Sequence, residues 1–233
     1  MYKVAGIVFD AVDCGETFRL RSPKYEVTEG KPEFRITLPD DEIEESLKNT
    51  PGASEEVIKY LLSGTKFYFE LIKREGMLLH SSAVVKDGRA FLFTANPGVG
   101  KSTHTGYWLE CFPDAYILND DKPAIRLENG VFYAYGTPWS GKHDISRNEG
   151  VPIGGIASLE RADHNFIEPM PTAAALAKLL SQTVRHVRAE RMNELLATLD
   201  RLINEVPIFR LGCLNGPSAA LLSESAMNKK AEE

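Results

Sequence analysis

A glycine-containing loop between two apolar segments constrains this chain more than any other feature. The stretch AFLFTANPGVGKSTHTGYWLE, residues 90–110, passes from an apolar run through the loop into an amphipathic run. Its centre, Ala95 to Ser102, matches the pattern GxxxxGK[ST], with alanine at the first position. Gly98 and Gly100 let the backbone turn with its N–H groups pointing inward. The pattern therefore predicts a strand, a loop and a helix that together form an anion cradle.

The residues of this loop have expected roles in binding a nucleotide. Lys101 places a positive charge between the β- and γ-phosphates, and Ser102 offers its hydroxyl to Mg²⁺. The helix that begins here turns its positive end toward the anion. We expect the nucleotide to be bound by Pro97, Gly98, Val99, Gly100, Lys101, Ser102 and Thr103. The competing interpretation is a glycine-rich turn that only resembles the pattern.

The loop is expected to follow a hairpin. Strand-like runs at 78–85 and 89–94 flank Asp87-Gly88, a strong signal for a tight turn. His80 then lies on the strand paired with the one that leads into the loop. A second hairpin is expected at Asn129-Gly130, and helical spacing predicts two helices between residues 172 and 206.

The N-terminal third predicts a separate small region. Residues 1–50 show short strand-like runs with polar breaks, and a helix is expected from Ser54, which is suited to be its N-cap. Gly64 is expected to kink or split that helix. We therefore divide the chain into an accessory region, residues 1–75, and a catalytic domain, residues 76–233.

Two adjacent acids are the next candidates for chemistry. Asp120 and Asp121 follow the strand-like run AYILN, and carboxylates at a strand end beside a phosphate loop suit a Mg²⁺–phosphate complex. One acid can hold the metal while the other accepts a proton from an incoming hydroxyl. The competing interpretation is a solvated turn, because Asn-Asp-Asp is also good turn chemistry.

The amino-acid composition narrows the classes of molecule that this chain is expected to bind. The 233-residue chain has a net charge of −6, so the basic face needed for general binding to nucleic acid or to an acidic membrane is not expected. No apolar run approaches the ~20 residues that span a bilayer, and the N-terminus does not read as a signal peptide. The three cysteines form no CxxC pair. These features predict a cytoplasmic protein with no nucleic-acid or membrane partner.

Together, the segments LLHSSAVV, AFLFTANPGVGKST and YILNDDK resemble the catalytic core of HPr kinase/phosphorylase and its bacterial relatives, best over residues 76–145. The resemblance implies an α/β P-loop fold of the HPr kinase/phosphoenolpyruvate carboxykinase type. Such a fold has a mixed sheet with a hairpin-fed P-loop, joined here by a small N-terminal α+β region. YGTPWSGKHD further resembles a smaller group of related proteins, many of which occur near peptide-modification genes.

The resemblance also implies a role for each matched residue. Asp120 corresponds to the catalytic aspartate, which takes the proton from an acceptor serine, and His80 to a histidine that hydrogen-bonds it. Asp121 corresponds to the neighbouring acid near the metal. Lys101 and Ser102 keep their phosphate and Mg²⁺ roles.

The loop GTPWSGK, residues 136–142, joins an aromatic ring to a cation. Lys142 is expected to contact the γ-phosphate or the acceptor, and Trp139 to pack on a base or a peptide. The alternative is a surface loop anchored by a half-buried tryptophan. His143, Arg147 and Arg161 are expected to be solvated or paired charges.

Three functional hypotheses remain open at this point. The first is an ATP- and Mg²⁺-dependent kinase that phosphorylates a hydroxyl, the serine of a protein or peptide. The second is a kinase or carboxykinase-like enzyme with a small-molecule acceptor. The third is a nucleotide-binding regulatory module with little turnover, favoured by Thr103 where the resembling family usually has glutamate. The sequence allows a homo-oligomer and does not decide among ATP, GTP and pyrophosphate.

Overall fold

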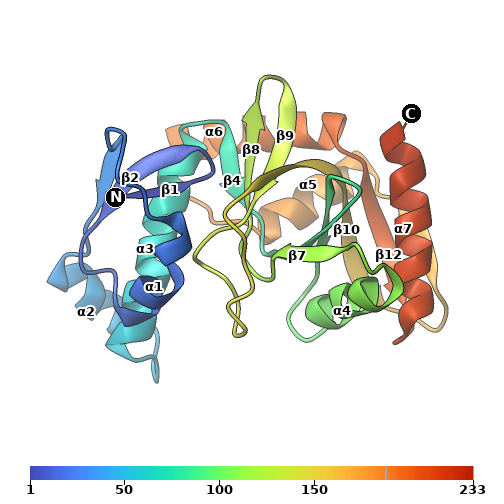
Figure 1. The fold of residues 1–233 in the computed structure, drawn as a ribbon, viewed down its shortest axis with the longest axis horizontal. Coiled ribbons are helices and arrows are strands. Elements are labelled where there is room, and N and C mark those ends of the chain that lie inside the picture. Colours follow the sequence, from blue (N-terminus) through green and yellow to red (C-terminus); the bar gives the residue numbers. More distant parts are fainter. Residues whose placement is uncertain (187, 233) are drawn as a thin grey trace.

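The computed structural model describes residues 1–186 and 188–232. The N-terminal third forms short strands and helices at one end of the molecule (Figure 1, blue to cyan). Its small sheet has the order β1-β2-β3, in which β1 and β2 are antiparallel and β2 and β3 are parallel. The elements are β1 (Tyr2–Val4), β2 (Ile7–Ala11), α1 (Glu16–Arg21), η1 (Pro23–Tyr25), β3 (Phe34–Ile36), α2 (Asp40–Asn49) and α3 (Glu55–Ile72).

The rest of the chain builds a mixed sheet that has nine strands within the described residues. Its path is β4-β8-β9-β10-β6-β5-β7, and β12 pairs with β10 and with β11. The elements are β4 (Gly76–Leu78), β5 (Ser81–Lys86), β6 (Arg89–Thr94), α4 (Lys101–Cys111), β7 (Tyr116–Asn119), β8 (Ala124–Glu128), β9 (Val131–Tyr135), β10 (Gly150–Arg161), β11 (Phe166–Pro169), α5 (Thr172–Ser181), α6 (Ala189–Glu205), β12 (Ile208–Cys213) and α7 (Pro217–Glu232).

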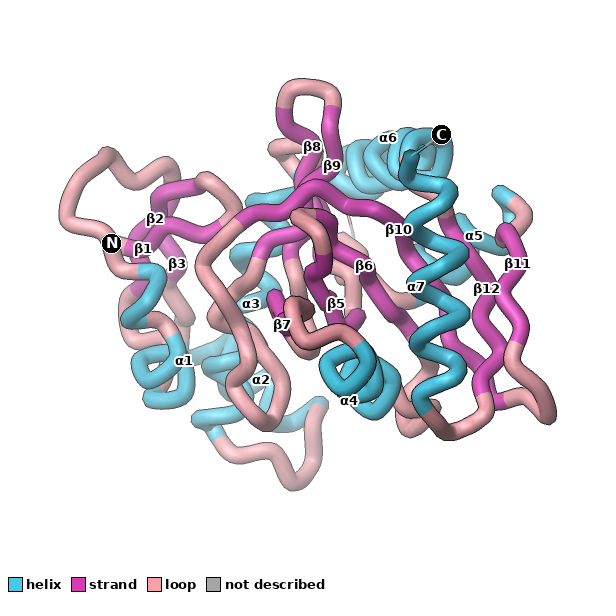
Figure 2. Tube along the Cα trace, turned by 45° about the vertical axis from the view of Figure 1, so that its right-hand side comes forward, coloured by secondary structure: helices cyan, strands magenta, loops and turns pink. Residues whose placement is uncertain are grey.

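Helices cover both faces of the part of this sheet around β6 (Figure 2). Successive side chains along β6 point to opposite faces of the sheet, so they pack against different helices. Leu92 belongs to the core shared with α5 and α6, whereas Phe91 and Phe93 pack with Trp108 of α4 and with α7. Among the described residues, no helix is both long enough and apolar enough to cross a membrane.

The long strand β10 curls the sheet by pairing differently along its length. Its first residues pair antiparallel with β9, and from Ile153 onward it runs parallel to β6 and then to β12. The register shifts between Ile153 and Gly155. A Cβ at Gly154 would lie 2.7 Å from the ring of Phe91, so a larger residue there would collide with the core.

Both expected hairpins are present. β5 and β6 pair antiparallel across Asp87 and Gly88, and β8 and β9 pair across Asn129 and Gly130. All four turn residues have positive φ, as a two-residue turn of this kind requires. The expected strand 78–85 is wrong in one respect, because it is broken at residues 79 and 80. His80 lies in that break, where its N–H donates to Gln182 O at 2.7 Å.

Helix α3 begins as expected and is not interrupted. The Ser54 hydroxyl accepts a hydrogen bond from Val57 N at 3.3 Å, which confirms the N-cap. The expectation that Gly64 splits the helix is wrong, since α3 continues to Ile72. A Cβ at Gly64 would lie 2.9 Å from Cδ1 of Trp139, so the glycine makes room for that ring.

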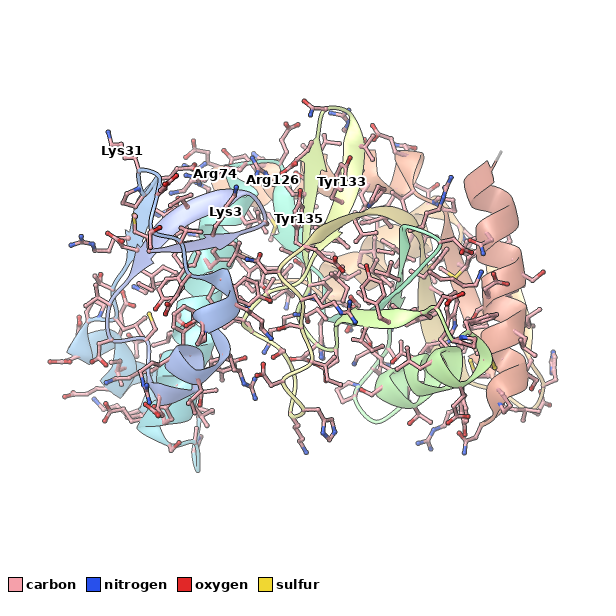
Figure 3. The ribbon with its side chains drawn as sticks, in the orientation of Figure 1. Lys3, Lys31, Arg74, Arg126, Tyr133 and Tyr135 are labelled. Atoms are coloured by element: carbon pink, nitrogen blue, oxygen red, sulfur yellow. The ribbon has the colours of Figure 1, made fainter. Side chains whose placement is uncertain are left out.

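The N-terminal region packs against the larger sheet through one shared aromatic core. Phe9, Phe67 and Tyr68 surround Trp139, which comes from the connection between β9 and β10. Arg126 of β8 donates to Ala5 O at 2.8 Å, linking the hairpin to the small sheet (Figure 3). The division of the chain at residue 75 stays a prediction.

Candidate active site

The loop after β6 has the backbone conformation that its glycines predict. Gly98 has φ +77° and Gly100 has φ +117°, a region that favours glycine. Helix α4 begins at Lys101 directly after them, and Ala95 is fully buried behind the loop. The first amides of a helix have no partner within it, so they remain available to an anion. We call residues 95–102 the phosphate loop.

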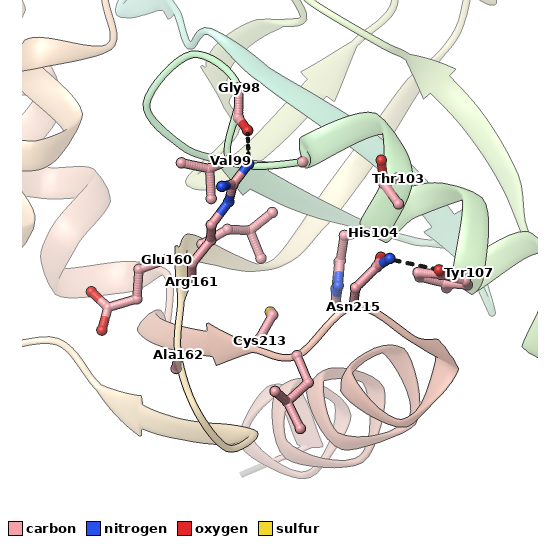
Figure 4. Close-up of a pocket in the computed structure, with 13 residues that line it drawn as sticks. Gly98, Val99, Thr103, His104, Tyr107, Glu160, Arg161, Ala162, Cys213 and Asn215 are labelled. Atoms are coloured by element: carbon pink, nitrogen blue, oxygen red, sulfur yellow. Dashed lines mark hydrogen bonds between the residues drawn. The ribbon is translucent and has the colours of Figure 1, made fainter.

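Two cations from outside the motif hold the phosphate loop from its flanks. Arg161, at the end of β10, donates from Nη2 to Gly98 O at 2.9 Å. Lys178 of α5 donates from Nζ to Asn96 Oδ1 at 3.1 Å. Arg161, expected to be a solvated or paired charge, is exposed and also makes this contact with the loop (Figure 4). Lys178 lies in an ordinary helical pattern that carries no signal of its contact.

The Lys101 side chain is half-buried at the start of α4. Burial lowers the pKa of its ammonium, and repulsion from Lys178 acts in the same direction, while the negative charge of Asp121 opposes both. The Ser102 and Thr103 side chains, which follow it, are exposed to solvent. Lys101 and Asp121 are therefore near enough to interact electrostatically.

Asn119 shapes the turn that presents the two acids. Its Oδ1 accepts from Asp121 N at 3.1 Å and from Lys122 N at 2.8 Å, and its Nδ2 donates to Thr137 O at 3.0 Å. These bonds satisfy a fully buried amide and fix the backbone just after β7. Sequence reasoning had treated Asn119 only as part of a polar turn.

The two carboxylates lie in different environments. Burial raises the pKa of Asp120, and the adjacent charge of Asp121 raises it further, although a hydrogen bond from Gly141 N opposes this. For Asp121, burial alone would raise the pKa, but the hydrogen bond from His80 and the charge of Lys122 outweigh it and lower the pKa. Asp121 is thus held as an anion, and Asp120 is the acid with the greater affinity for a proton.

The expected contact between His80 and Asp120 is wrong. His80 Nε2 lies 2.9 Å from Asp121 Oδ1 instead. The break between β4 and β5 sets this geometry, because Ser81 N donates to Asp121 O at 3.1 Å and so aligns the His80 segment with the second acid. Thr94 Oγ1 also donates to His80 O at 2.9 Å, tying this segment to the end of β6 before the phosphate loop.

Asp120 is contacted from the 136–149 loop, the connection between β9 and β10. Gly141 N donates to Asp120 Oδ1 at 2.7 Å. A Cβ at position 141 would lie 3.0 Å from both carboxylate oxygens, so the absence of a side chain allows this approach. Sequence reasoning had noted Gly141 only as part of a glycine-flanked loop.

The 136–149 loop places Trp139 and Lys142 in different environments. Trp139 is 1% exposed and donates from Nε1 to Ser63 Oγ at 3.0 Å, so the expectation that it packs on a base or a peptide is wrong. Its ring is instead core of the N-terminal region. Lys142, three residues on, is exposed, and a contact between it and phosphate or acceptor stays a prediction.

Comparisons with known proteins give little further information. No family model and no curated protein matches this sequence. Among solved structures, the chain is similar to the Hpr(Ser) kinase/phosphatase from Coxiella burnetii, at 13% sequence identity and a TM-score of 0.37, over 65% of this chain and 88% of that chain. A TM-score this low indicates at most a distant relationship between the two folds, and it assigns no activity to this chain.

Proposed function

We propose that this chain is a Mg²⁺-dependent phosphotransferase that moves the γ-phosphoryl group of ATP to a hydroxyl, the serine of a protein or peptide. The observation that carries the proposal is the pair of adjacent carboxylates beside the phosphate loop, whose pKa values are shifted in opposite directions. Titratable neighbours whose environments separate their pKa values are typical of acid–base sites. A site that only bound a nucleotide would not need this separation.

Asp121 and Ser102 would hold the metal. Hydroxyl and carboxylate oxygens are ligands that Mg²⁺ accepts, and it takes its remaining ligands from phosphates and water. The lowered pKa of Asp121 fits this role, because a metal ligand must be ionised. Bound Mg²⁺ would neutralise charge on the β- and γ-phosphates. His80 would position Asp121 through the 2.9 Å contact.

Asp120 would act as the base. As the acceptor oxygen bonds to the γ-phosphorus, the bond to the β–γ bridging oxygen breaks, and Asp120 takes the hydroxyl proton. Its raised pKa improves it as a proton acceptor, and Gly141 N keeps one carboxylate oxygen in place. Lys101 and the first amides of α4 would bind the phosphates, and Lys142 would contact the γ-phosphate or the acceptor.

One observation favours the alternative of a binding module. Thr103, exposed in the first turn of α4, stands where the resembling family usually has a glutamate near the metal. A chain lacking that carboxylate would bind a nucleotide and turn it over slowly. The alternative of a small-molecule acceptor has no comparable feature in its favour.

The test uses γ-labelled ATP, Mg²⁺, the purified protein and a lysate of its own host, with macromolecules and metabolites separated afterwards. We expect label in a protein or peptide band that disappears with Asp120→Asn. Lys101→Ala should abolish both transfer and nucleotide binding, whereas Asp120→Asn should leave binding nearly intact. Label confined to a small-molecule peak would make the protein a metabolite kinase. ATP binding with no mutant-sensitive label in any fraction would favour the binding module.

A further inference from the structure

A groove of about 320 Å³ lies where the N-terminal region meets the start of α6. Its walls come from parts of the chain that are far apart in sequence: β3, α3, the connection between α5 and α6, and the first turn of α6. The volume is at the lower end of the range of about 300–1,000 Å³ that binding sites occupy. The groove shares no lining residue with the phosphate loop or with the two acids, so its role is separate from theirs.

Positive side chains dominate the lining of this groove. Five lysines and arginines line it against one acid, Glu70, in a chain whose net charge is −6. We call it the basic groove, after the cations Arg35, Lys66, Lys73, Arg188 and Arg191. Charges of one sign that gather in a groove focus the electric field and attract ligands of the opposite sign. The lining therefore suits an anionic ligand.

Ion pairs around the basic groove do not cancel this charge. Arg188 is exposed and forms no ion pair with a described residue. The other four cations are paired with acids, of which only Glu70 lines the groove: the pairs are Arg35–Asp10, Lys66–Glu42, Lys73–Glu70 and Arg191–Glu194. Ion pairs that solvent reaches contribute little to stability, so an incoming carboxylate can share or replace an acid at small cost.

Two half-buried rings of the basic groove contact each other. The ring centroids of Phe69 and His186 lie 4.4 Å apart in an edge-on arrangement. His186 Nδ1 accepts from Arg188 N at 3.0 Å, which leaves the ring proton on Nε2. Among the described residues, Nε2 has no hydrogen-bond partner. The groove thus offers a ligand apolar surface and a placed donor as well as positive charge.

The basic groove follows the open edge of β3. Within the described part of the chain, β3 pairs only with β2. Successive side chains of a strand point to opposite faces, yet Phe34, Arg35 and Ile36 all line the groove, so it runs along the edge of the strand. An edge strand presents unpaired N–H and C=O groups, to which an extended peptide can bond. A small anion or a nucleic acid would leave this edge unused.

A short segment connects the basic groove with the candidate active site. Gln182 O accepts from His80 N at 2.7 Å, and the chain then leads to His186 and Arg188. Arg188 follows Gln182 by six residues, so their Cα atoms are at most about 22 Å apart. About six or seven extended residues of a peptide span the same distance. A peptide bound in the groove therefore lies within reach of the two acids.

We propose that the basic groove binds an acidic peptide segment in extended conformation, as a strand added to β3. The Arg188 guanidinium and His186 Nε2 would bind its carboxylates, and Phe34 and Phe69 would pack against the apolar side chains between them. The inference goes beyond the proposed function and does not depend on it, because binding in the groove needs neither a nucleotide nor the two acids.

The experiment measures dissociation constants of fluorescently labelled peptides for the full chain by anisotropy, without ATP. The probe is the peptide Glu-Val-Glu-Val-Glu-Val, and Lys-Val-Lys-Val-Lys-Val has the same pattern with opposite charge. We expect the acidic peptide to bind about tenfold more tightly or better. Proline in place of its second valine removes a main-chain donor and should weaken binding by about threefold or more.

A matched pair of variants locates the binding. Arg188→Glu should weaken binding of the acidic peptide by about tenfold. Lys3→Glu makes the same change in net charge at an exposed position of β1 outside the groove (Figure 3) and should change the constant by less than about twofold. The Arg188 side chain makes no capping hydrogen bond to α6, so we expect Arg188→Glu to keep the melting temperature of the unmodified protein.

Several outcomes would overturn the inference. Equal losses in Arg188→Glu and Lys3→Glu would reduce the effect to overall charge. Equal affinity for the acidic and the basic peptide, or for the proline peptide and its parent, would exclude an acidic strand on β3. Tighter binding of a short thymidine oligonucleotide than of the acidic peptide would make nucleic acid the occupant instead. Because no nucleotide is present, failure of the transfer assay would reject the proposed function and leave these results unchanged.

Discussion

The phosphate loop and the 136–149 loop both approach the pair of acids, Asp120 and Asp121, yet they are held in different ways. The phosphate loop takes its shape from its own residues, because Gly98 and Gly100 adopt positive φ and α4 begins at the next position. The 136–149 loop has no comparable local signal. It is held by side chains from the N-terminal third of the chain.

Three of those contacts hold the backbone just before Gly141, the residue that contacts Asp120. Tyr60 OH lies 3.0 Å from Pro138 O and 3.1 Å from Ser140 O, and Arg21 Nη1 donates to Ser140 O at 2.7 Å. Gly141, which donates to Asp120, follows immediately. The backbone conformation of the phosphate loop thus depends on local sequence, whereas the environment of the proposed base depends on packing between distant segments.

The largest expected effect tests whether the 136–149 loop depends on the burial of Trp139 in the aromatic core. Trp139→Ala removes a fully buried ring from the aromatic core, and we expect the free energy of unfolding to fall by about 3–5 kcal/mol. Urea denaturation followed by circular dichroism measures it. A loss below about 1 kcal/mol would mean that the loop does not depend on the N-terminal region.

The second prediction concerns the helix that carries the phosphate loop. Burial lowers the folded-state pKa of His104 to about 4 from 6.5, so the unfolded chain binds more protons between these values. Stability should therefore fall as the pH drops from 6.5 to 4, by about 3 kcal/mol at about 1.4 kcal/mol per pKa unit. His104 also contacts Ser223 of α7 at 3.2 Å, so the effect reports how α4 is anchored.

Denaturation series at several pH values check this slope. His104→Gln should flatten it, because it removes the buried imidazole. If the slope persists in His104→Gln, then other groups produce it, and the buried histidine does not limit the stability of this region at low pH.

Third, two helical glycines give a matched pair. Gly64→Ala should destabilise the protein by about 1–3 kcal/mol, because its Cβ would lie 2.9 Å from the Trp139 ring. Gly106→Ala in α4 has nothing within 4 Å of its Cβ and should stabilise the protein by up to about 1 kcal/mol. Melting curves of the two variants should shift in opposite directions. An unchanged or higher melting temperature for Gly64→Ala would show that Gly64 is not needed for the fit of Trp139.

The smallest expected effect tests whether the N-terminal region influences the proposed base, Asp120, through Tyr60. Tyr60→Phe removes a hydroxyl that holds the backbone before Gly141, at a cost of about 1 kcal/mol in stability. We expect kcat for transfer to fall severalfold with the KM for ATP unchanged, because the phosphate loop is untouched. Tyr133→Phe on β9 is the control, since its hydroxyl makes no hydrogen bond to a described residue. An equal change in both variants would contradict the link.

The sequence by itself determined the parts whose signals are local. The turns at Asp87-Gly88 and Asn129-Gly130, the N-cap at Ser54 and the strand–loop–helix around Gly98 were all predictable, because a few adjacent residues fix the backbone there. The pair Asp120-Asp121 at a strand end was predictable for the same reason. The short elements α1, α2 and β11 were not, since four to ten residues carry too little pattern.

Only the tertiary structure decided which distant groups meet. It placed His80 beside Asp121 rather than Asp120, took Trp139 into the core, and brought Arg161 and Lys178 to the phosphate loop. Two neighbouring carboxylates are equivalent in sequence, and they differ here because desolvation and hydrogen bonding depend on what packs around each. A motif specifies the backbone over a few residues, whereas pairing, burial and pKa depend on segments that folding alone brings together.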